Sequence, residues 1–520
     1  MMARVTIDPL TRIEGHLRVE VEVEDGKVVD AWVSGSLFRG MEDVLKGREP
    51  DDAYYISQRI CGVCPISHGH ASTKGTEDAL GIEVPDGARL VRNIIEGAQY
   101  LHSHILWFYT LAALDYVDVV SALSANVADT YALAEAAGTR VADFGAIQKR
   151  LQTFVDGGQL SIFTNAFFGH PAYKLPAELN LIAVAHYLEA LEMQARASAI
   201  IGLMGGKFPH FMTSVPGGTS FVPTEQKLDD ALYRLLDVVS FIDEALIPDT
   251  LAIAPYYLEA ATYGVGTTNL LSWGVFEEAS NDPYERALPR GSIQGGNLTV
   301  NPAEKEKVIE YVDHSWYEAD SGNLNPASGV TKPRFTDYST DEKYSWAKAP
   351  RYDGKPHEVG PLARMVVAYA SGVKPVQDLV DSTLEALGVA GQPEILFSLL
   401  GRVAARNLEA KYVADITVRY MNELIELIKS GEAKFFSAQR ATDGEGAGLW
   451  EAPRGSVGHW TNIKGNRIEN YQVVAPTTWN IAPRDADDQR GPIEEALIGT
   501  PVEETERPVE VLRVVHSFDP

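Results

Sequence analysis

The chain has 520 residues, of which 45% are hydrophobic and 22% are charged, as in an ordinary globular protein with a large core. Its formal net charge of −27 argues against a nucleic-acid partner, because such partners require a basic surface. We find no apolar run of about 18 residues that would predict a transmembrane helix. The N-terminus has no basic segment followed by an apolar run, so we expect no signal peptide of its own.

The N-terminal segment 3–34 predicts strands. Residues 16–24 alternate between apolar and polar side chains, Asp25-Gly26 supplies a hairpin turn, and residues 28–33 form the returning strand. The stretch 8–16 before this hairpin contains too many charged residues for a plain strand start.

Cys61 and Cys64 are the only cysteines of the chain, and Gly62 between them permits a short turn. This spacing suits a redox disulfide or half of a metal site with zinc, iron–sulfur or nickel–iron chemistry. The pair follows two segments that carry Glu14 and Glu42. These glutamates suit a metal ligand and a proton carrier, although solvated carboxylates at loop ends are the more common case.

The middle of the chain predicts long helices. Apolar residues recur at helical spacing over 90–116 and again over 176–204, where two glycines end the pattern. His102 and His104 lie two positions apart and therefore on different helix faces, so we interpret them as packing or surface residues. The segment 255–350 is rich in Gly, Asn, Pro and Tyr, which predicts an irregular segment attached to a helical body. Further helices are expected at 225–247, 302–313, 376–388 and 395–430.

Proline–arginine motifs mark the last third of the chain. Ala-Pro-Arg-Tyr occupies 349–352, Glu-Val-Gly-Pro-Leu-Ala-Arg occupies 358–364, and Ala-Pro-Arg-Gly occupies 452–455. Proline restricts the backbone and glycine permits a close turn, so a guanidinium in such a loop is held rigidly. Rigid guanidiniums suit small anions or polar diatomic ligands, and structural contacts with carboxylates are the alternative.

Taken together and in this order, the motifs resemble the large subunit of nickel–iron hydrogenases along nearly the whole chain. The resemblance implies a mainly α fold with small β elements (α+β) and a large helical body, with the metals buried where both chain ends meet. It implies a single large-subunit domain over 1–520, with its C-terminal end incomplete. The matching motifs are Arg-Ile-Glu-Gly-His at 12–16, Phe-Arg-Gly-Met-Glu at 38–42, Arg-Ile-Cys-Gly-Val-Cys at 59–64, Gly-His-Pro at 169–171, Phe-Pro-His at 208–210, the three proline–arginine motifs, Pro-Thr-Thr-Trp-Asn at 476–480 and His-Ser-Phe-Asp-Pro at 516–520.

The activity that this resemblance implies is the reversible heterolytic oxidation of H2 to protons and electrons. In the family, cysteine thiolates bridge a nickel and an iron, and the iron carries CO and cyanide ligands. Cys61 would be a terminal nickel ligand and Cys64 a bridging one. Soft thiolates suit these metals and keep the site electron-rich.

The resemblance also implies roles for residues around the metals. Arg454 looks like the family's arginine above the open metal face, and Asp519 like an acidic residue beside it. Thr477 would donate a hydrogen bond to a cyanide ligand. Glu14 matches the first proton carrier, and His68 matches a histidine that supports the bridging cysteine.

A magnesium ion is implied at a distance from the bimetallic centre. Glu42 matches its carboxylate ligand, and Val473 would supply a backbone carbonyl oxygen. Hard oxygen donors of this kind are what magnesium prefers.

The chain departs from the family at two places. Ser103 stands where related enzymes often have aspartate, and we expect it to tune proton or oxygen handling. Family members continue past His-Ser-Phe-Asp-Pro into a second C-x-x-C and a magnesium-binding histidine, whereas this sequence stops at Pro520. Two thiolates cannot hold the bimetallic centre, so activity would require the missing ligands.

Three hypotheses account for the stop at Pro520. The favoured one is a selenocysteine codon, otherwise read as a stop, at the position of the first missing cysteine, which would make this a nickel–iron–selenium enzyme. The others are a separate short peptide that carries the last ligands, and a truncation.

The resemblance further implies a small subunit with Fe–S clusters, because this chain has no other cysteines to bind them. Co-export with that subunit would place the protein in the periplasm or at the membrane-associated cell envelope. The segment 157–176 is similar to membrane-associated uptake enzymes, which implies a membrane cytochrome b reached through the small subunit.

Two functions from other classes remain as alternatives. A metal-free hydrogenase-like scaffold subunit or an inactive truncated form is the first, although the scaffold lineage lacks the cysteines that this chain keeps. A thiol–disulfide oxidoreductase is the second, and the sequence lacks the βαβ context that such a motif needs.

Overall fold

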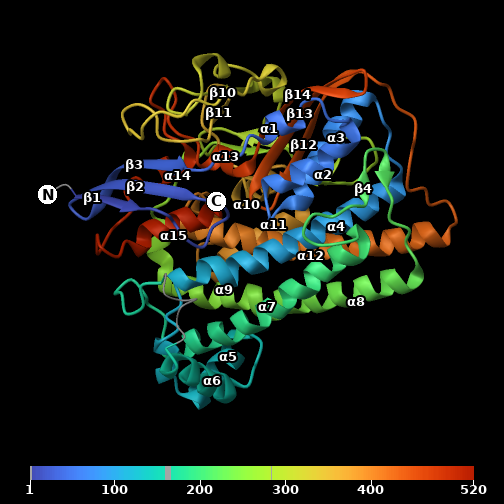
Figure 1. Cartoon of the computed structure of the whole chain (residues 1–520). Helices are drawn as coiled ribbons and strands as arrows, with labels where there is room; N and C mark the ends of the chain where they lie inside the picture. The colour runs from blue at the N-terminus through green and yellow to red at the C-terminus, as the bar shows by residue number, and fades with distance from the viewer. Residues whose placement is uncertain (1–2, 159–165, 283) are drawn as a thin grey trace.

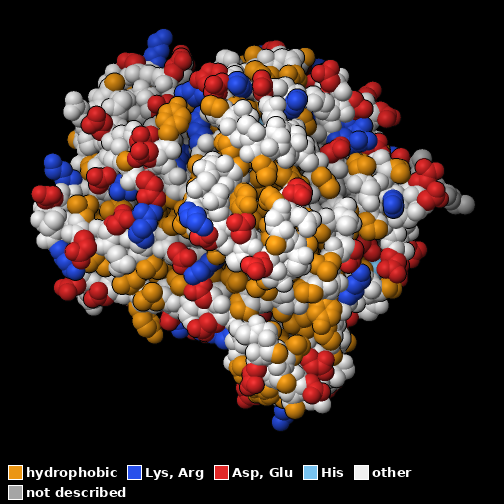
Figure 2. Space-filling model, turned by 180° about the vertical axis from the view of Figure 1, so that it is seen from behind, with side chains coloured by type: hydrophobic (Ala, Val, Ile, Leu, Met, Phe, Trp, Pro, Cys, Tyr) orange, Lys and Arg blue, Asp and Glu red, His pale blue; other side chains and the backbone are white. Residues whose placement is uncertain are grey.

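The computed structural model describes residues 3–158, 166–282 and 284–520 and consists of a body of long helices with small sheets packed along one side (Figure 1). Residues 159–165, within the segment that is similar to membrane-associated enzymes, lie outside the described residues. Within the described ranges, no helix combines the length and the apolar composition that a bilayer span requires. On the face seen in Figure 2, acidic side chains are spread among basic ones without a continuous basic stripe.

Four long helices form the centre of the helical body. α4 (Asp86–Ile105) packs against α7 (Ala177–Gly205) and α12 (Leu399–Lys429), and α7 also packs against α8 (Glu225–Phe241). Their facing sides are buried Leu, Ile, Val and aromatic side chains, which form one continuous core. The expected long helices are therefore confirmed.

The remaining helices surround this centre. α5 (Val127–Ala137) and α6 (Phe144–Asp156) form the projection at the bottom of Figure 1. The expected helix at 376–388 is confirmed as α11 (Lys374–Ala386). The others are α1 (Met41–Leu45), α2 (Pro50–Ser57), α3 (Pro65–Leu80), α9 (Ile247–Ile253), α10 (Pro361–Ala370), α13 (Pro476–Asn480), α14 (Pro492–Leu497) and α15 (Val509–Phe518).

The expected helix at 302–313 is wrong. A 3-10 turn over Lys305–Lys307 leads into β10 (Val308–Tyr311), which pairs antiparallel with β11 (Ala349–Tyr352). Burial alternates along β10, as in a half-buried strand. Its partner strand comes from a distant segment, so the local pattern did not reveal the pairing.

Two three-stranded antiparallel sheets lie near the two ends of the chain. The first orders β1 (Ala3–Ile7), β2 (Leu17–Glu24) and β3 (Lys27–Gly35), which confirms the predicted hairpin. The second orders β12 (Gly444–Ala452), β13 (Gly455–Lys464) and β14 (Arg467–Val474). Short pairs complete the strands: β4 (Ser214–Val215) with β5 (Gly218–Thr219), β6 (Leu270–Ser272) with β9 (Gly291–Ile293), and β7 (Val275–Glu277) with β8 (Arg286–Leu288).

Helix α3 lies directly on the backbone of β12. Gly444, Gly446 and Gly448 recur with the period of a strand and face the helix. A Cβ atom at Gly448 would stand 1.7 Å from the carbonyl oxygen of Ala71, and one at Gly444 would stand 1.8 Å from that of Ala79. Because these glycines have no side chain, α3 packs close to the backbone of β12. This contact fixes the position of the first turn of α3.

The two ends of the chain meet at one place. The N–H of Glu14 donates to the carbonyl oxygen of Pro520 over 3.2 Å. Arg12 and His516 both bind the carboxylate of Asp115. In Figure 1 the C-terminus accordingly lies at the centre of the molecule, beside the N-terminal sheet. The expectation that both ends converge is confirmed.

Candidate metal centre

The two cysteines lie on the turn that leads into α3, where Cys64 is the N-cap residue. Both thiols are free and buried, with 7% of Cys61 and 3% of Cys64 exposed. The N–H of Cys64 donates to the sulfur of Cys61 over 3.0 Å. A hydrogen bond from the Cys64 side chain lowers the pKa of Cys61 against the opposing effect of burial, and the charge of Arg454 adds to the lowering. The turn is thus arranged to hold a thiolate.

Glu14 reaches this turn from the N-terminal loop. Its Oε1 accepts a hydrogen bond from the N–H of Gly62 over 3.1 Å, which places the carboxylate against the residue between the cysteines. The side chain is exposed in this chain, so it connects the buried cysteine turn with the surface.

Arg454 and Asp519 meet beside the cysteines. Nη2 of Arg454 donates to Oδ1 of Asp519 over 2.9 Å, and Nη1 donates to Oγ of Ser103 over 3.4 Å. Nε of Arg454 is buried without an acceptor. Burial lowers the pKa of Arg454, but Asp519 and then the two cysteine sulfurs outweigh this effect and raise it. The structure therefore brings these predicted residues into one electrostatic unit.

Arg406 is a member of this unit that the sequence analysis missed. It is buried on α12 and donates to Oδ2 of Asp519 over 3.4 Å and to the carbonyl oxygen of Ser517 over 3.2 Å. Despite the two guanidiniums, burial raises the pKa of Asp519. A charged residue on an otherwise apolar helical face was the available signal.

The loop that carries Arg454 is held from below by Arg364. This fully buried guanidinium donates to the carbonyl oxygens of Ala452 and Pro453 over 2.8 and 2.9 Å, and it pairs with Glu409 and Glu451. Gly455 has φ +135°, and a Cβ there would lie 2.5 Å from Cγ2 of Val359. The motifs at 358–364 and 452–455 thus fit into one another.

Arg351, in the similar Ala-Pro-Arg-Tyr motif, has a different role. Its guanidinium pairs with Asp485 and donates to the carbonyl oxygens of Pro483 and Gln489. All these partners are structural. Arg351 therefore fits the structural interpretation of the proline–arginine motifs, whereas Arg454 lies beside the cysteines.

Glu42, Val473 and Thr477 line one cavity of about 270 Å³, which also contacts Ile60, the residue before Cys61. Oε1 of Glu42 accepts the N–H of Val473 over 2.9 Å. Lys348 lines the same cavity and pairs with Glu310 over 3.2 Å. The predicted magnesium residues are therefore neighbours. Thr477 makes no hydrogen bond to either cysteine within the described chain.

His68 lies one helical turn after Cys64 and begins a buried hydrogen-bonded chain. Its Nδ1 is 3.0 Å from Nε2 of His459, whose Nδ1 is 2.8 Å from the hydroxyl of Tyr471. Burial lowers the pKa of His68 to about 4, so the ring is neutral at neutral pH. His459 and Tyr471, both on the C-terminal sheet, were missed because only tertiary folding brings them to α3.

The donor set at the cysteine turn fits a soft metal. Two free buried sulfurs stand beside a guanidinium whose Nε lacks an acceptor, an arrangement suited to thiolate ligands and small polar groups. A second cluster, His170 with Glu503 and Glu510, brings its ligand atoms within 4.8 Å of one another. There the N–H of Ala172 donates to Nδ1 of His170, so the ring proton is on Nε2 and the imidazole is not free to ligate.

Comparisons with known proteins consistently identify hydrogenases. The family described as nickel-dependent hydrogenase matches residues 39–520, and a HoxL-like family matches residues 4–34. The uptake hydrogenase large subunit of Rhizobium leguminosarum bv. viciae is 41% identical, with 99% of this chain and 94% of the relative covered. The hydrogenase-2 large chain of Escherichia coli K12 is also 41% identical, with 100% and 96% covered.

Solved structures agree with these sequence relatives. The [NiFeSe]-hydrogenase of Dm. baculatum matches with a TM-score of 0.84 at 36% identity, covering 100% of this chain and 99% of that one. The Ni-Fe-Se hydrogenase of D. vulgaris Hildenborough gives the same score and identity, with 98% of its chain covered.

Proposed function

The chain belongs to the nickel-dependent hydrogenase family, and from this premise we propose that the buried cysteine turn is where molecular hydrogen is split. The protein is the catalytic large subunit of a hydrogenase, an oxidoreductase that acts on H2 with nickel and iron. The observation that carries the placement of the site is the pair of free buried thiols beside Arg454 and Asp519.

We propose that Cys61 would bind nickel alone and that Cys64 would bind both nickel and iron, with CO and cyanide as further ligands of the iron. When bound, the metals supply Lewis acidity that polarises H2 against sulfur. Thr477 would donate to a cyanide ligand, which its place in the cavity beside Ile60 supports. His68 would orient Cys64, since its own Nδ1 is fixed by His459.

Arg454 keeps a positive charge beside the sulfurs and thereby favours their thiolate form. Asp519 holds that guanidinium in one orientation through the 2.9 Å contact. Glu14 would take the proton released at the cysteine turn, because its carboxylate already contacts Gly62 and is exposed on its other side. The proton would then leave through the surface of the N-terminal loop.

We propose a magnesium site at Glu42 and the carbonyl oxygen of Val473. The proximity of the two residues supports this proposal, since Oε1 of Glu42 accepts the N–H of Val473 over 2.9 Å. Their oxygen donors are of the hard type that magnesium takes.

A small subunit is the expected partner of a hydrogenase large subunit, and we propose that its Fe–S clusters receive the electrons. Its docking surface would surround the cysteine turn. There Arg39 donates to the carbonyl oxygens of Arg59 and Ile60 at the surface, and Arg59 stacks on Tyr55. The exposed Leu37, at 54%, supplies apolar area beside them.

We also propose a location for the protein and an acceptor for its electrons. The similarity to uptake hydrogenase large subunits supports a periplasmic or membrane-associated protein, exported with its small subunit. A membrane cytochrome b would then accept electrons from that subunit.

The test uses the native complex of large and small subunits. Cys61→Ser and Cys64→Ser are expected to abolish bound nickel, measured by mass spectrometry of the metals, together with H2-dependent dye reduction. Lys332→Ser, at an exposed site far along the chain, serves as the control and should retain both. Full nickel content in the cysteine variants would refute the proposed ligands, and an absence of nickel in the native complex would favour the metal-free scaffold.

A further inference from the structure

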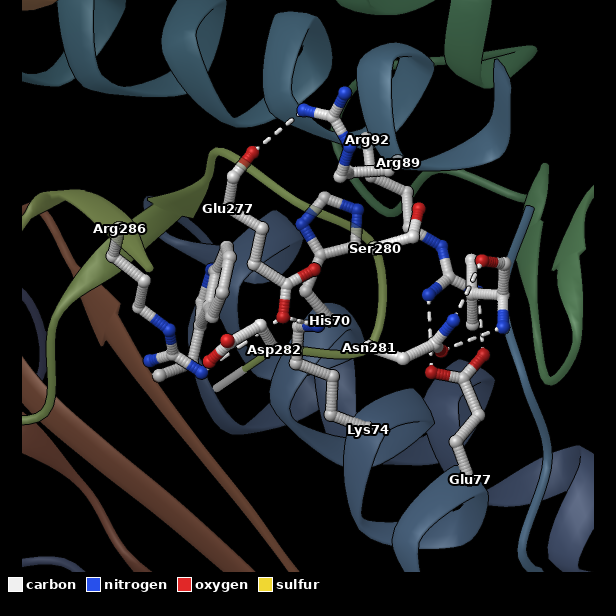
Figure 3. A network of polar contacts seen from close by, with 12 residues as sticks. His70, Lys74, Glu77, Arg89, Arg92, Glu277, Ser280, Asn281, Asp282 and Arg286 are labelled. Carbon is white, nitrogen blue, oxygen red and sulfur yellow. Dashed lines mark hydrogen bonds and ion pairs between the residues drawn. The ribbon is translucent and has the colours of Figure 1, made fainter. Parts of the chain in front are cut away.

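A second cavity, of about 570 Å³, lies at the far end of α3 from Cys64 and shares no residue with the cysteine site. Its walls come from the C-terminal half of α3, the turn between β7 and β8, and residues 303–306. Figure 3 shows Lys74 and Glu77 of α3 in the lower part of the view, with Glu277 and Arg286 above them and to the left. A volume of this size suits a small molecule.

The charges of the cavity are arranged in two layers. The basic side chains that line it are buried or half-buried, namely Lys74, Arg89, Arg286, Arg290 and Lys305. Most of the acidic lining residues are exposed and belong to the rim, namely Asp78, Glu83, Glu304 and Glu306. The inner wall is therefore more positive than the mouth.

The two acidic residues inside the cavity already have partners. Glu77 makes a bidentate pair with Arg92, with distances of 3.1 and 2.7 Å (Figure 3). Glu277 pairs with the ammonium of Lys74. Both carboxylates therefore already neutralise cations of the cavity wall, and Glu277 also lies 3.9 Å from Nη2 of Arg286.

Arg286 is buried, and its Nη1 is directed at three carbonyl oxygens. It donates to the backbone of Trp273, Gly274 and Leu449, and its Nε has no acceptor. The nearest ion-pair contact is with Glu277 at 3.9 Å, and Asp282 is drawn beside it in Figure 3. Burial lowers the pKa of Arg286 to about 10.

Arg290 differs from the other basic lining residues because no carboxylate among the described residues forms an ion pair with it. Its Nε donates to the carbonyl oxygen of Ala303 over 2.7 Å, while both terminal nitrogens have no acceptor among the described residues. The guanidinium lies 5.0 Å from the ring centre of Trp273 and 5.6 Å from that of Tyr284. Within the described ranges, no carboxylate approaches it to 4.0 Å. The rings fix the orientation of a planar group with two free donors.

We propose that this cavity binds a small molecule through an oxyanion, a carboxylate or phosphate group, held by the two terminal nitrogens of Arg290. Glu304 and Glu306 act on Arg290 only from a distance, so its terminal nitrogens have no carboxylate in contact, and a bidentate contact with two ligand oxygens matches their geometry. Arg286 adds positive potential behind Arg290. The exposed ring of Tyr284, at 71%, would cover the ligand from the solvent side.

Calorimetric titration of the native complex tests this proposal, with inorganic phosphate and succinate as separate probes. We expect saturable binding of at least one probe, weakened about tenfold or more by Arg290→Gln, since tenfold corresponds to one lost charged contact of about 1.4 kcal/mol. Lys332→Gln is the matched control, because it removes an exposed cation elsewhere and should not change binding. H2 oxidation should remain at the native level in both variants.

The outcomes separate the sources of the anion. Binding of phosphate alone assigns a phosphate-bearing ligand, binding of succinate alone assigns a carboxylate, and binding of both assigns the shared oxyanion chemistry. Saturable binding of neither probe, or equal binding by Arg290→Gln, would overturn the proposal. If Arg290→Gln does not fold, Tyr284→Ala replaces it, because that exposed side chain can be removed without opening the core, and the same tenfold criterion applies.

Discussion

At the scale of the residue, the partner of a side chain decides its role. Arg351 and Arg454 both follow an Ala-Pro pair, and both are buried. The donors of Arg351 are directed at Asp485 and backbone carbonyl oxygens. Arg454 keeps Nε without an acceptor and has the two cysteines within its electrostatic reach. Arg351 therefore stabilises the fold, whereas Arg454 lies beside the proposed metal ligands.

Arg454→Lys should lower H2 oxidation by about 100-fold or more while nickel content stays at the native level. An ammonium cannot contact Asp519 and keep a planar donor surface beside the sulfurs at the same time. Steady-state H2 oxidation together with metal analysis measures this effect. Native activity in the variant would show that a point charge is sufficient.

Arg351→Lys is the matched substitution and should act on stability instead. Losing its contacts with Pro483 and Gln489 leaves buried carbonyl oxygens without donors, at a cost of about 1–3 kcal/mol each. A lowered urea midpoint with unchanged turnover per bound nickel is expected. A specific loss of turnover would place Arg351 in the site after all.

At the scale of the element, the contact between α3 and β12 positions the cysteine turn. A strand with glycine at every second position allows the helix to rest on its backbone. Because Cys64 is the N-cap of α3, any displacement of the helix moves a sulfur.

Gly448→Ala should therefore lower both stability and nickel content. The added methyl group would stand 1.7 Å from the carbonyl oxygen of Ala71, so the helix must shift, at a cost of about 1–3 kcal/mol. Thermal unfolding and metal analysis measure the two effects. Gly202→Ala in α7 is the control, since nothing lies within 4 Å of the added atom and helix propensity favours alanine. Native nickel content in Gly448→Ala would show that the contact is tolerant.

The N-terminus of α14 provides a pH-dependent contact between elements. The buried carboxyl of Glu494 accepts hydrogen bonds from the N–H of Val33 on β3 and from the hydroxyl of Tyr344. Burial raises its pKa to about 7, well above the ordinary value of a glutamate. Because the folded-state pKa is raised, this group's stabilisation is complete below about pH 4.5 and is lost as pH rises through about 7.

Glu494→Gln should remove this part of the pH dependence, which amounts to at most about 3 kcal/mol. Urea unfolding at several pH values across that window measures it, with the exposed Glu506→Gln as the control. An unchanged slope in Glu494→Gln would contradict the assignment.

At the scale of the whole molecule, Asp115 joins three distant parts of the chain. It binds Arg12 of the N-terminal loop and His516 of α15, and His516 also contacts the carbonyl oxygen of Thr11. Both ring nitrogens of His516 thus lie against oxygen atoms. Burial raises the pKa of Asp115, but the two cations outweigh it and lower the pKa to about 2.

Asp115→Asn should destabilise the fold by about 3–5 kcal/mol, because it leaves two buried cations without their anion. Nickel should be lost as well, since the loop that carries Glu14 and the C-terminal segment that carries Asp519 would separate. Chemical denaturation and metal analysis test this, with Asp378→Asn in an exposed pair as the control. Native stability in Asp115→Asn would show that the two ends are held by other contacts.

Much of the chemistry could be predicted from local motifs. The cysteine turn, the hairpin at Asp25-Gly26 and the long helices depend on residues close in sequence, and the structure has them where the sequence analysis expected them. The exception was 302–313, where β10 forms because a partner strand is supplied from 349–352. Hydrophobic periodicity describes neighbours along the chain and contains no information about such a partner.

Residue type and spacing alone identified the candidate groups: two thiols, the carboxylates of Glu14 and Asp519, and the guanidinium of Arg454. Folding brings these groups together, and it places Arg406, His459 and Asp115 among them. The unpaired guanidinium of Arg290 likewise became visible only once its neighbours were placed. The burial of a group and the charges around it depend on residues that are distant in sequence, whereas a motif contains only residue type and spacing.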